Sequence, residues 1–406
     1  MELFKNTNYD FLGKKWPFII LSLLLSAAGI ISLIVKGGPR YGIDFRGGAL
    51  VTVRFAQRPP VDKVRAALEP KLPVEVTEVT GNNDDIIGTD EKNEKALQDV
   101  RQTIVQTLTA ALAPAPAGKY NINNAGAAAL ADALRDPLQR GGVAMSEPQL
   151  QDLAKNIVSF RDTPPNSGLI RSLDDLSKVQ GVTPAVLNVV KQETYPSPLA
   201  VINTETVGAK IGADLQRQAM LAVLYALAGM LVYIAFRFEW IYGVAAVIAV
   251  FHDTIITVGL FSIFNKEISL TVVAALLTLV GYSMNDTIVV FDRIRENLKT
   301  LRRESLESVV NRSVNQTLSR TVLTSGLTFL TAFALLLFGG QVLHGFSFAL
   351  VCGIIVGTYS SIFIASPIVI FWQDYLESRK RTPAAVAVSA PRESKEAVRR
   401  GTAKVK

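Results

Sequence analysis

The sequence is poor in the side chains that build most enzyme active sites and metal centres. Its 406 residues include one cysteine, Cys352, and two histidines, His252 and His344. A single cysteine forms no disulfide within the chain, and the position of Cys352 inside an apolar run indicates a packing role. We recognise no Ser-His-Asp set, no metal-ligand cluster and no phosphate-binding Walker loop. We therefore expect a protein that is not an enzyme, needs no cofactor and takes its energy from a source other than ATP.

Apolar residues are abundant, and the basic residues are unevenly placed. Apolar residues make up 49% of the chain, the mean hydropathy is +0.29 and the net charge is +7. The lysines and arginines cluster beside the ends of apolar runs, which is typical of membrane topology rather than of a nucleic-acid surface. We therefore expect a membrane protein, and we do not expect nucleic-acid binding as its main function.

Six apolar segments are long enough to cross a membrane. A hydrocarbon layer of about 30 Å needs roughly 20 helical residues at about 1.5 Å each. The first segment follows Lys14 and Lys15 but has no small-residue cleavage site, so we interpret it as a retained helix rather than a signal peptide. The segments are residues 16–35, 216–236, 241–264, 268–291, 322–340 and 345–371.

The basic residues predict the orientation of these segments. They are concentrated in the tail 1–15, in the loop after the fourth segment and in the tail 372–406. With six spans all three regions fall on one side, which the positive-inside rule makes the cytoplasm. Residues 36–214 then form an extracytoplasmic, periplasmic domain. The last tail lacks periodicity, which predicts disorder, and its charge favours contact with anionic membrane lipids.

The first part of the outer domain has the element order of a ferredoxin-like unit. Strand patterns occur at 49–55, at 74–80 and around Ile86-Ile87, and helical spacing occurs at 61–72 and 94–112. With a closing strand at 199–206, the order is strand-helix-strand-strand-helix-strand. This order predicts an α+β ferredoxin-like unit made of residues 41–118 and 199–206.

Residues 119–193 do not fit this order and are predicted to be an α-helical insert. Ser172 is suited to cap a helix, Gly181 to end it and Pro184 to start the next. This helix-hairpin-helix pattern is similar to the tandem modules of competence proteins and of a type II secretion minor pseudopilin. Because only two lysines lie near the hairpin, we interpret the insert as a protein-interaction or spacer module, with DNA binding through the phosphate backbone as the alternative.

Polar and ionisable side chains inside the spans are candidate functional residues, because they are costly in lipid. Asp286 lies six residues before Asp292, which places it about 9 Å inside the cytoplasmic edge of the fourth segment. Arg320 enters the fifth segment from the same side, and its long side chain can reach inward to pair with Asp286. The third segment contains His252 and Asp253 near its midpoint.

A buried carboxyl beside a movable guanidinium is suited to take up and release a proton. Burial favours its protonated form, whereas the guanidinium favours its ionised form. The sequence therefore predicts a proton pathway formed by Asp286, Arg320, Asp253, Asn285 and His252. In the alternative, Asp286 is a static hydrogen-bonding group between helices and Arg320 only anchors the membrane interface.

Several long, ordered motifs resemble the signature segments of the SecF family of the bacterial protein-export machinery. They are Tyr41–Gly48 (YGIDFRGG), 236–240 (FRFEW), His252-Asp253, 281–287 (GYSMNDT), 291–297 (FDRIREN), 315–321 (NQTLSRT) and 357–361 (GTYSS). The resemblance covers residues 1–118 and 199–380. It implies one half of a fold related to the resistance-nodulation-division (RND) exporters, in the inner membrane, with both termini cytoplasmic. It also places Asp286 and Arg320 at the family's proton-pathway positions. The insert departs from the usual outer domain.

The resemblance also implies partners. SecD would form a heterodimer with this chain and supply six more spans and a larger outer domain. The pair would assist the SecYEG channel after SecA has driven the early ATP-dependent stage, with YajC and YidC nearby. The outer domains would hold unfolded exported polypeptide, and the proton motive force would prevent it from sliding back.

Two other functions stay open at this point. The chain is alternatively half of an RND-type exporter of small molecules or lipids, which predicts a complete twelve-span unit or a homotrimer. It is alternatively a purely structural subunit that stabilises the channel, which predicts that export survives the loss of the Asp286 carboxyl.

Overall fold

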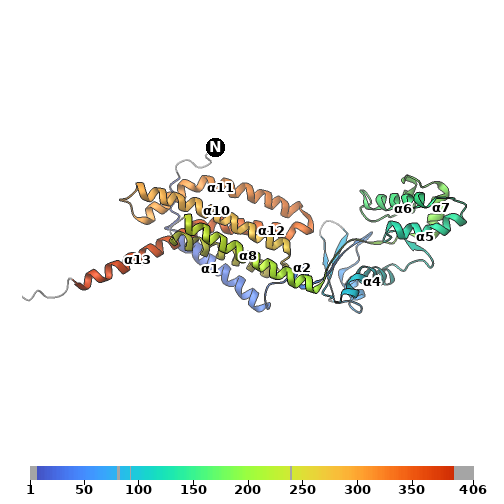
Figure 1. Ribbon diagram of the computed structural model, residues 1–406, viewed down its shortest axis with the longest axis horizontal. Coiled ribbons are helices and arrows are strands. Elements are labelled where there is room, and N and C mark those ends of the chain that lie inside the picture. Colours follow the sequence, from blue (N-terminus) through green and yellow to red (C-terminus); the bar gives the residue numbers. More distant parts are fainter. Residues whose placement is uncertain (1–6, 80–82, 92, 238–239, 388–406) are drawn as a thin grey trace, which may run out of the picture. The chain divides into compact units, whose positions relative to one another are not determined.

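The computed structural model describes residues 7–79, 83–91, 93–237 and 240–387 (Figure 1). The motif at 236–240 and the tail predicted at 372–406 lie partly outside these residues. The chain divides into two compact units, one of Met1–Arg40 with Ala222–Lys406 and one of Tyr41–Leu221. The first unit contains most of the predicted spans, and the second contains most of the predicted outer domain.

Within the described residues, six helical stretches are long and apolar enough to span a membrane, which confirms the prediction. They are α1 (Lys15–Val35), α8 (Ala209–Arg237), α9 (Trp240–Ile263), α10 (Leu270–Thr300), α11 (Leu306–Phe338) and the pair α12 (Gly340–Ser360) and α13 (Ser366–Ala387), joined by the π-helical turn Ser361–Ala365. Helix α11 begins well before the predicted span 322–340. Its start is fixed by Ser305, whose hydroxyl accepts a hydrogen bond from the Ser308 N–H at 3.3 Å.

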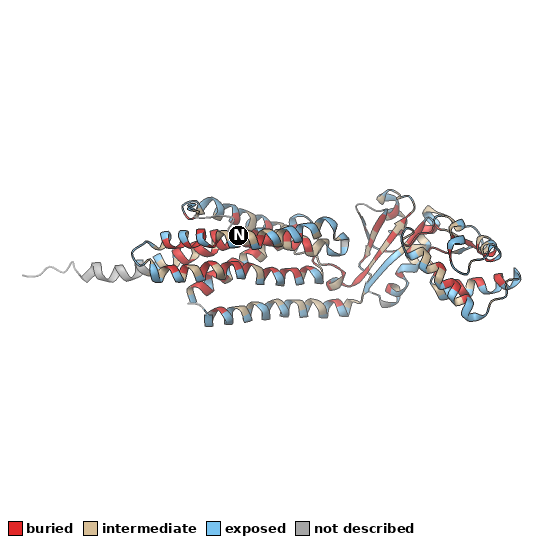
Figure 2. Cartoon of the chain, turned by 90° about the horizontal axis from the view of Figure 1, so that it is seen from above, coloured by how far each residue is buried: buried red, intermediate tan, exposed pale blue. Residues whose placement is uncertain are grey.

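The main hydrophobic core of the membrane unit is built chiefly by α9, α10, the first part of α11, the π-helical turn and α13. In Figure 2 the buried residues gather along the inner helices of the membrane unit. About half of the spanning window of α9 is buried, whereas only 6% of that of α8 and 11% of that of α1 is buried. The apolar faces of α1 and α8 are therefore left for lipid or another protein. The core side chains include Tyr242, Ala246, Val250, Met284, Phe291, Val314, Phe363 and Val369.

The outer unit contains the predicted four-stranded antiparallel sheet. Its strands are β1 (Gly48–Phe55), β2 (Val74–Glu78), β3 (Asp84–Thr89) and β6 (Leu199–Val207), in the spatial order β2-β3-β1-β6. This is the ferredoxin-like order. Helices α3 (Val61–Leu68) and α4 (Glu94–Leu112) contribute to the same core as the sheet. Helix α3 ends earlier than the predicted 61–72, because the chain turns at Lys71 and Leu72 to enter β2.

Two glycines connect the first short helix of this unit, α2 (Ile43–Arg46), to β1. Gly47 has φ +77° and Gly48 has φ +126°, both in the region that favours glycine. A Cβ on Gly47 would also lie 2.8 Å from the Cα of Ala209. The paired glycines of the motif Tyr41–Gly48 are therefore required by the backbone.

The insert forms a helical subdomain with its own core. It contains α5 (Ala127–Arg140), α6 (Glu147–Asp162), a 3-10 helix (Leu173–Lys178) and α7 (Pro184–Glu193), which group together in Figure 1. The entering strand β4 (Tyr120–Asn121) pairs with the leaving strand β5 (Thr194–Tyr195). The first helix of the predicted hairpin is thus a single tight 3-10 segment, because only six residues lie between the cap Ser172 and Val179.

The two lysines beside this hairpin are neutralised within the insert. Lys178 pairs with Asp175 at 2.8 Å, and Lys191 pairs with Asp174. The hydrogen bond and charge of Lys191 lower the pKa of Asp174, which keeps this carboxylate ionised. Paired lysines offer little attraction to phosphate, so the structure favours the protein-interaction or spacer interpretation of the insert.

Two asparagines fasten the insert to the sheet. The side-chain amide of Asn123 donates to the carbonyls of Ile170 and Ser197 at 2.9 and 2.8 Å, and its oxygen accepts from Ile170 N–H. Asn124 bonds both Leu199 and Val201 at the start of β6. Buried amides satisfied in this way hold one geometry, so the insert is fixed against the β6 end of the sheet.

Candidate functional site

A buried carboxylate in α9 is the centre of a polar cluster in the membrane unit. Asp253 is 1% exposed. One of its oxygens accepts hydrogen bonds from the hydroxyls of Ser283 on α10 at 2.5 Å and Ser360 on α12 at 3.0 Å. The other oxygen lies 2.9 Å from Nδ1 of His252. Both carboxylate oxygens of Asp253 therefore have polar partners, as a charge-bearing group in a low-dielectric bundle requires.

The cluster continues from His252 to α1. Nε2 of His252 contacts the Ser22 hydroxyl, and the Tyr359 hydroxyl donates to the same Ser22 oxygen at 3.3 Å. Tyr359 and Ser360 directly precede the π-helical turn, a feature that is frequent at functional sites. A connected row of groups that can donate and accept protons therefore crosses from α1 to α10.

Close packing of α1 on α9 makes this row possible. A Cβ on Gly29 would lie 2.8 Å from the Cα of Gly259, closer than real Cβ atoms come. Three residues further along each helix, the hydroxyls of Ser32 and Ser262 are 2.8 Å apart. Small residues let the two backbones approach so that short serine side chains can bridge them.

A second buried carboxylate lies between α10 and α11. Asp286 is 2% exposed, and its Oδ2 accepts a hydrogen bond from the Ser325 hydroxyl at 2.9 Å. Asp286 follows Ser283 by three residues, which places the two on neighbouring positions of α10, about 4.5 Å apart along its axis. Since Ser283 bonds Asp253, helix α10 connects the two carboxylate clusters.

The structure does not bring all five predicted pathway residues together. Asp286, Asp253 and His252 are inside the bundle, but Asn285 and Arg320 are exposed. Arg320 lies five residues before Ser325, which is about 140° around the axis of α11. In the described part of the chain, Ser325 and not Arg320 is therefore the hydrogen-bond partner of Asp286.

The sequence interpretation also missed the serines that surround His252 and Asp253. Ser22, Ser283 and Ser360 are each at most 1% exposed. Hydroxyl residues are common in membrane helices, where they bond their own backbone, so their identity gives little signal. A serine one helical turn from an intramembrane acid is the pattern that would have found Ser283.

The motif at 315–321 has a structural role that the sequence did not indicate. The Asn315 side chain accepts from Tyr9 N–H and donates to Tyr9 carbonyl oxygen, both at 2.8 Å. Asn311 accepts from Phe11 N–H at 2.9 Å. Two asparagines one turn apart on α11 thus bind the backbone of the amino-terminal segment and place Leu12 in the core.

The hydroxyl, imidazole and carboxyl groups of this arrangement can donate and accept protons. No group of three or more His, Cys, Asp or Glu is placed to hold a metal ion in the described residues. His344 is apart from the carboxylates and lies 3.0 Å from the Lys266 amine. The candidate site is therefore the pair of clusters around Asp253 and Asp286.

Comparison with known proteins assigns the chain to a family. A family model described as protein export membrane protein SecD/SecF, C-terminal, matches residues 187–375, and one described as the SecD/SecF GG motif matches residues 31–57. The protein translocase subunit SecF of Koribacter versatilis is 50% identical over 414 residues, covering 97% of this chain and 98% of the relative. The chain belongs to the SecF family. The SecF of Rhodothermus marinus is 35% identical and covers 94% of this chain.

Solved SecDF structures have the same fold. A SecDF crystal structure from Thermus thermophilus superposes with a TM-score of 0.63 and 32% identity over 91% of this chain. A second, titled as the super-membrane-facing form, gives a TM-score of 0.55 and 30% identity. The chain spans 39% of the length of the first SecDF chain. With its six apolar helices and its SecF relatives, this chain is a multi-pass membrane protein.

Proposed function

We propose that the chain is an auxiliary subunit of the Sec preprotein translocase that works with SecD in the bacterial inner membrane. It uses the proton motive force, and no bound cofactor, to complete the translocation of exported polypeptide. Both termini face the cytoplasm in this proposal, because the basic residues gather at one side of the six spans. We also propose SecYEG, SecA, YajC and YidC as partners, because the chain belongs to the SecF family.

The observation that carries this proposal is the environment of Asp286. Its carboxyl is buried between two membrane helices, and a single serine hydroxyl is its hydrogen-bond partner in the described residues. An ionised carboxylate normally has several partners in such surroundings, so a carboxyl with one hydroxyl partner is suited to change its protonation state when its neighbours move. A group poised in this way takes up a proton in one conformation and releases it in another.

Arg320 is the cation available for the second conformation. It is on the helix that supplies Ser325 but faces outward in this structure. A rotation of α11, or a change of the Arg320 rotamer, would bring its guanidinium toward Asp286 and favour release of the proton. One charge moved across 100 mV yields about 2.3 kcal/mol, enough to bias such a rearrangement about fiftyfold.

The exposed polar residues support SecD as the partner. Asn285 on α10 and Arg320 and Thr324 on α11 are exposed although they lie in apolar helices. Ionisable residues in spanning helices almost always face protein or water rather than lipid. A second six-helix subunit covering this face would shield them, and the chain spans 39% of a SecDF chain.

Asp253 and His252 complete the proposed pathway. Ser283 contacts Asp253 and lies three residues from Asp286 on α10, so a proton has a short polar route between the clusters. His252 extends the route to Ser22 and Tyr359. We assign Asp286 the coupling step and the His252–Asp253 pair the relay to the other helices.

The test is translocation of a reporter preprotein into inverted membrane vesicles after SecA-driven initiation. Wild type and Asp286→Asn are each purified with SecD and assayed with and without a proton gradient. The asparagine keeps a hydrogen bond to Ser325 but does not ionise. We expect a variant that assembles normally and loses the gradient-dependent part of translocation.

Asp292→Asn is the matched control, because Asp292 lies on the same helix but is exposed and pairs with Arg237 at 3.4 Å. It should retain the gradient effect. Gradient-dependent export that persists in Asp286→Asn would reject the relay and leave a structural subunit as the better account. Gradient-driven efflux of a small molecule or lipid by this chain without SecD would instead favour the exporter.

A further inference from the structure

The outer sheet has an open edge at β6. In the order β2-β3-β1-β6 this strand is terminal, and Ile202 to Thr206 are all exposed. An edge strand carries a row of peptide groups without a strand partner, which can pair with another extended chain. Natural proteins usually cover or interrupt such edges. The pairing of β6 with β1 has one register shift, at Ile202, and the exposed residues Asn203 to Thr206 continue beyond it in regular register. This regular, exposed stretch of edge points to a use.

The insert covers only the first part of the edge. The side chain of Asn124 accepts from Val201 N–H and donates to Leu199 carbonyl oxygen, both at 2.9 Å, as a neighbouring strand would do. Beyond Val201, no side chain of the described residues bonds to the outer peptide groups of β6. The cover therefore ends where the exposed residues begin.

The register shows which peptide groups face outward. Phe55 N–H bonds the Asn83 carbonyl on the β3 side, so alternation along β1 directs Thr52 toward β6. Thr52 is opposite Asn203, so the peptide groups of Asn203 bond to β1. The peptide groups of the next residue, Thr204, point the other way, and its N–H faces the open edge. Thr204 thus offers a donor to an added strand.

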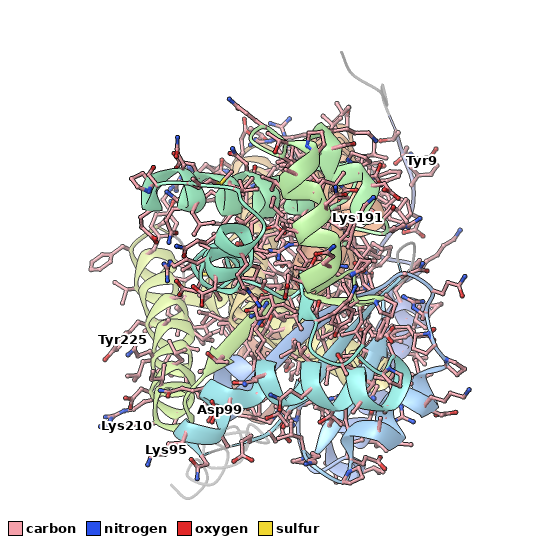
Figure 3. The ribbon with its side chains drawn as sticks, turned by 90° about the vertical axis from the view of Figure 1, so that its right-hand side faces the viewer. Tyr9, Lys95, Asp99, Lys191, Lys210 and Tyr225 are labelled. Atoms are coloured by element: carbon pink, nitrogen blue, oxygen red, sulfur yellow. The ribbon has the colours of Figure 1, made fainter. Side chains whose placement is uncertain are left out.

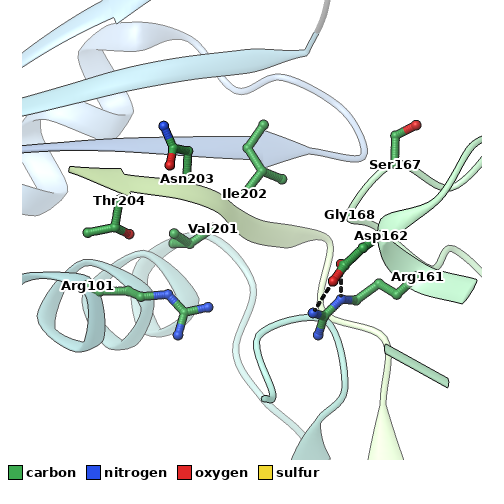
Figure 4. Close-up of a pocket in the computed structure, with 9 residues that line it drawn as sticks. All are labelled: Arg101, Arg161, Asp162, Ser167, Gly168, Val201, Ile202, Asn203 and Thr204. Atoms are coloured by element: carbon green, nitrogen blue, oxygen red, sulfur yellow. Dashed lines mark hydrogen bonds and ion pairs between the residues drawn. The ribbon is translucent and has the colours of Figure 1, made fainter. Parts of the chain in front are cut away.

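A pocket of about 440 Å³ adjoins this edge (Figure 4). Four successive residues of β6, Val201 to Thr204, form one side. Arg101 of α4 and the loop at Ser167 and Gly168 contribute to the rest, together with the end of α6. The volume lies within the usual range for ligand sites, about 300–1,000 Å³.

The two arginines of this pocket differ in their partners. Arg161 is fixed: it pairs with Asp162 at 2.7 Å and donates to the carbonyls of Ile122 and Ala125. Arg101 is exposed and has no carboxylate partner in the described residues; in Figure 4 no dashed line joins it to a neighbour. The pocket therefore presents one uncompensated guanidinium beside an open strand edge.

We propose that the β6 edge and this pocket bind an extended polypeptide segment that carries an acidic side chain. The segment adds to the sheet as a further strand beside β6, and its carboxylate bonds the guanidinium of Arg101. Main-chain pairing accepts almost any sequence, whereas the arginine selects segments with a carboxylate at the right position. This binding site is independent of the proton pathway and needs no membrane potential.

Binding is measured with the full-length chain in detergent by fluorescence anisotropy. The probe is an eight-residue peptide of alternating threonine and valine with one central glutamate, blocked at both ends. A second probe has glutamine in place of the glutamate. We expect Arg101→Gln to raise the Kd of the glutamate peptide about tenfold and to leave that of the glutamine peptide unchanged. Thr204→Pro removes the outward N–H and should weaken both peptides, since proline is tolerated at edges but donates nothing.

Lys95→Gln is the matched control, because Lys95 is an exposed cation on the same helix, α4, outside the pocket (Figure 3). It removes the same charge and should leave both Kd values unchanged. Equal effects of Arg101→Gln and Lys95→Gln would overturn the proposal, because nonspecific charge would then explain binding. Loss of peptide binding when SecD is bound would also overturn it, since a partner subunit would then occupy the edge. The assay uses no gradient, so its outcome is separate from that of the Asp286→Asn experiment.

Discussion

The contact between Gly29 and Gly259 is a sharp test of how α1 joins the bundle. A Cβ added to Gly259 would lie 2.6 Å from the Cα of Gly29. Non-bonded carbon atoms pack best at about 3.5–4.0 Å. The atoms that a Cβ on Gly259 would meet are backbone atoms of Gly29, which cannot rotate away as a side chain could. Gly259→Ala must therefore push the two helices apart by about 1 Å.

This separation has a cost that can be worked out from the local contacts. The hydroxyls of Ser32 and Ser262, now 2.8 Å apart, would move out of hydrogen-bond range. An interhelical bond of this kind contributes about 0.6 kcal/mol in a membrane, and overpacking costs about 1–3 kcal/mol. Alanine gains at most about 1 kcal/mol in helix propensity over glycine. We expect a net loss of about 1–2 kcal/mol and a weaker Ser22–His252 contact.

The assay combines thermal unfolding of the purified protein with cross-linking. Ser32→Cys and Ser262→Cys, placed in a Cys352→Ser background, should form a disulfide readily with Gly259 present and slowly with Gly259→Ala. Gly326→Ala is the control: a Cβ there meets nothing within 4 Å, so the propensity gain should leave Tm equal or higher. A Gly259→Ala protein with unchanged Tm and unchanged cross-linking would refute the close approach of α1 and α9.

Three other perturbations have defined outcomes. Arg54 donates two hydrogen bonds of 2.7 Å to the Asp84 carboxylate, and Asp84→Ala removes both. This change should lower the free energy of unfolding of the outer unit by about 3 kcal/mol in denaturant titrations. Burial raises the pKa of Asp85, so the folded state holds this proton more tightly than the unfolded state. The stabilisation from Asp85 is present at acid pH and is lost as pH rises through the raised pKa. The Tm of Asp85→Asn relative to wild type should therefore increase as pH rises above about 4. Asn315→Ala removes two hydrogen bonds to the Tyr9 backbone and should speed amide hydrogen exchange there about tenfold or more.

Each of these has a control on a nearby residue. Asp62→Ala breaks an exposed pair with Arg65 and should change stability by less than about 0.5 kcal/mol. An equal loss in Asp62→Ala and Asp84→Ala would contradict the special role of the buried pair. A Tm difference for Asp85→Asn that does not vary with pH would contradict the raised pKa. Gln316→Ala, on the same helix, should leave exchange at Tyr9 unchanged.

The membrane spans and the positions of the strands along the chain were predictable, because each rests on a local pattern. A run of about 20 apolar residues or an alternation with period two is visible without any long-range contact. Proline at 184 and glycine at 181 likewise mark a turn by their own conformational limits. The length of α11 was less predictable, because its first turns are polar and are stabilised by packing on the amino-terminal segment.

The sequence alone determined that this is a six-span membrane protein with acidic residues inside the spans. Because a charge in lipid is costly, Asp253 and Asp286 are candidate functional residues whichever way their helices face. Only the tertiary structure decided what those acids contact. Helix rotation is set by packing against neighbours, and it turned Ser325 toward Asp286 and Arg320 away. It also placed Ser22, Ser283 and Ser360, which are distant in sequence, around one histidine–aspartate pair.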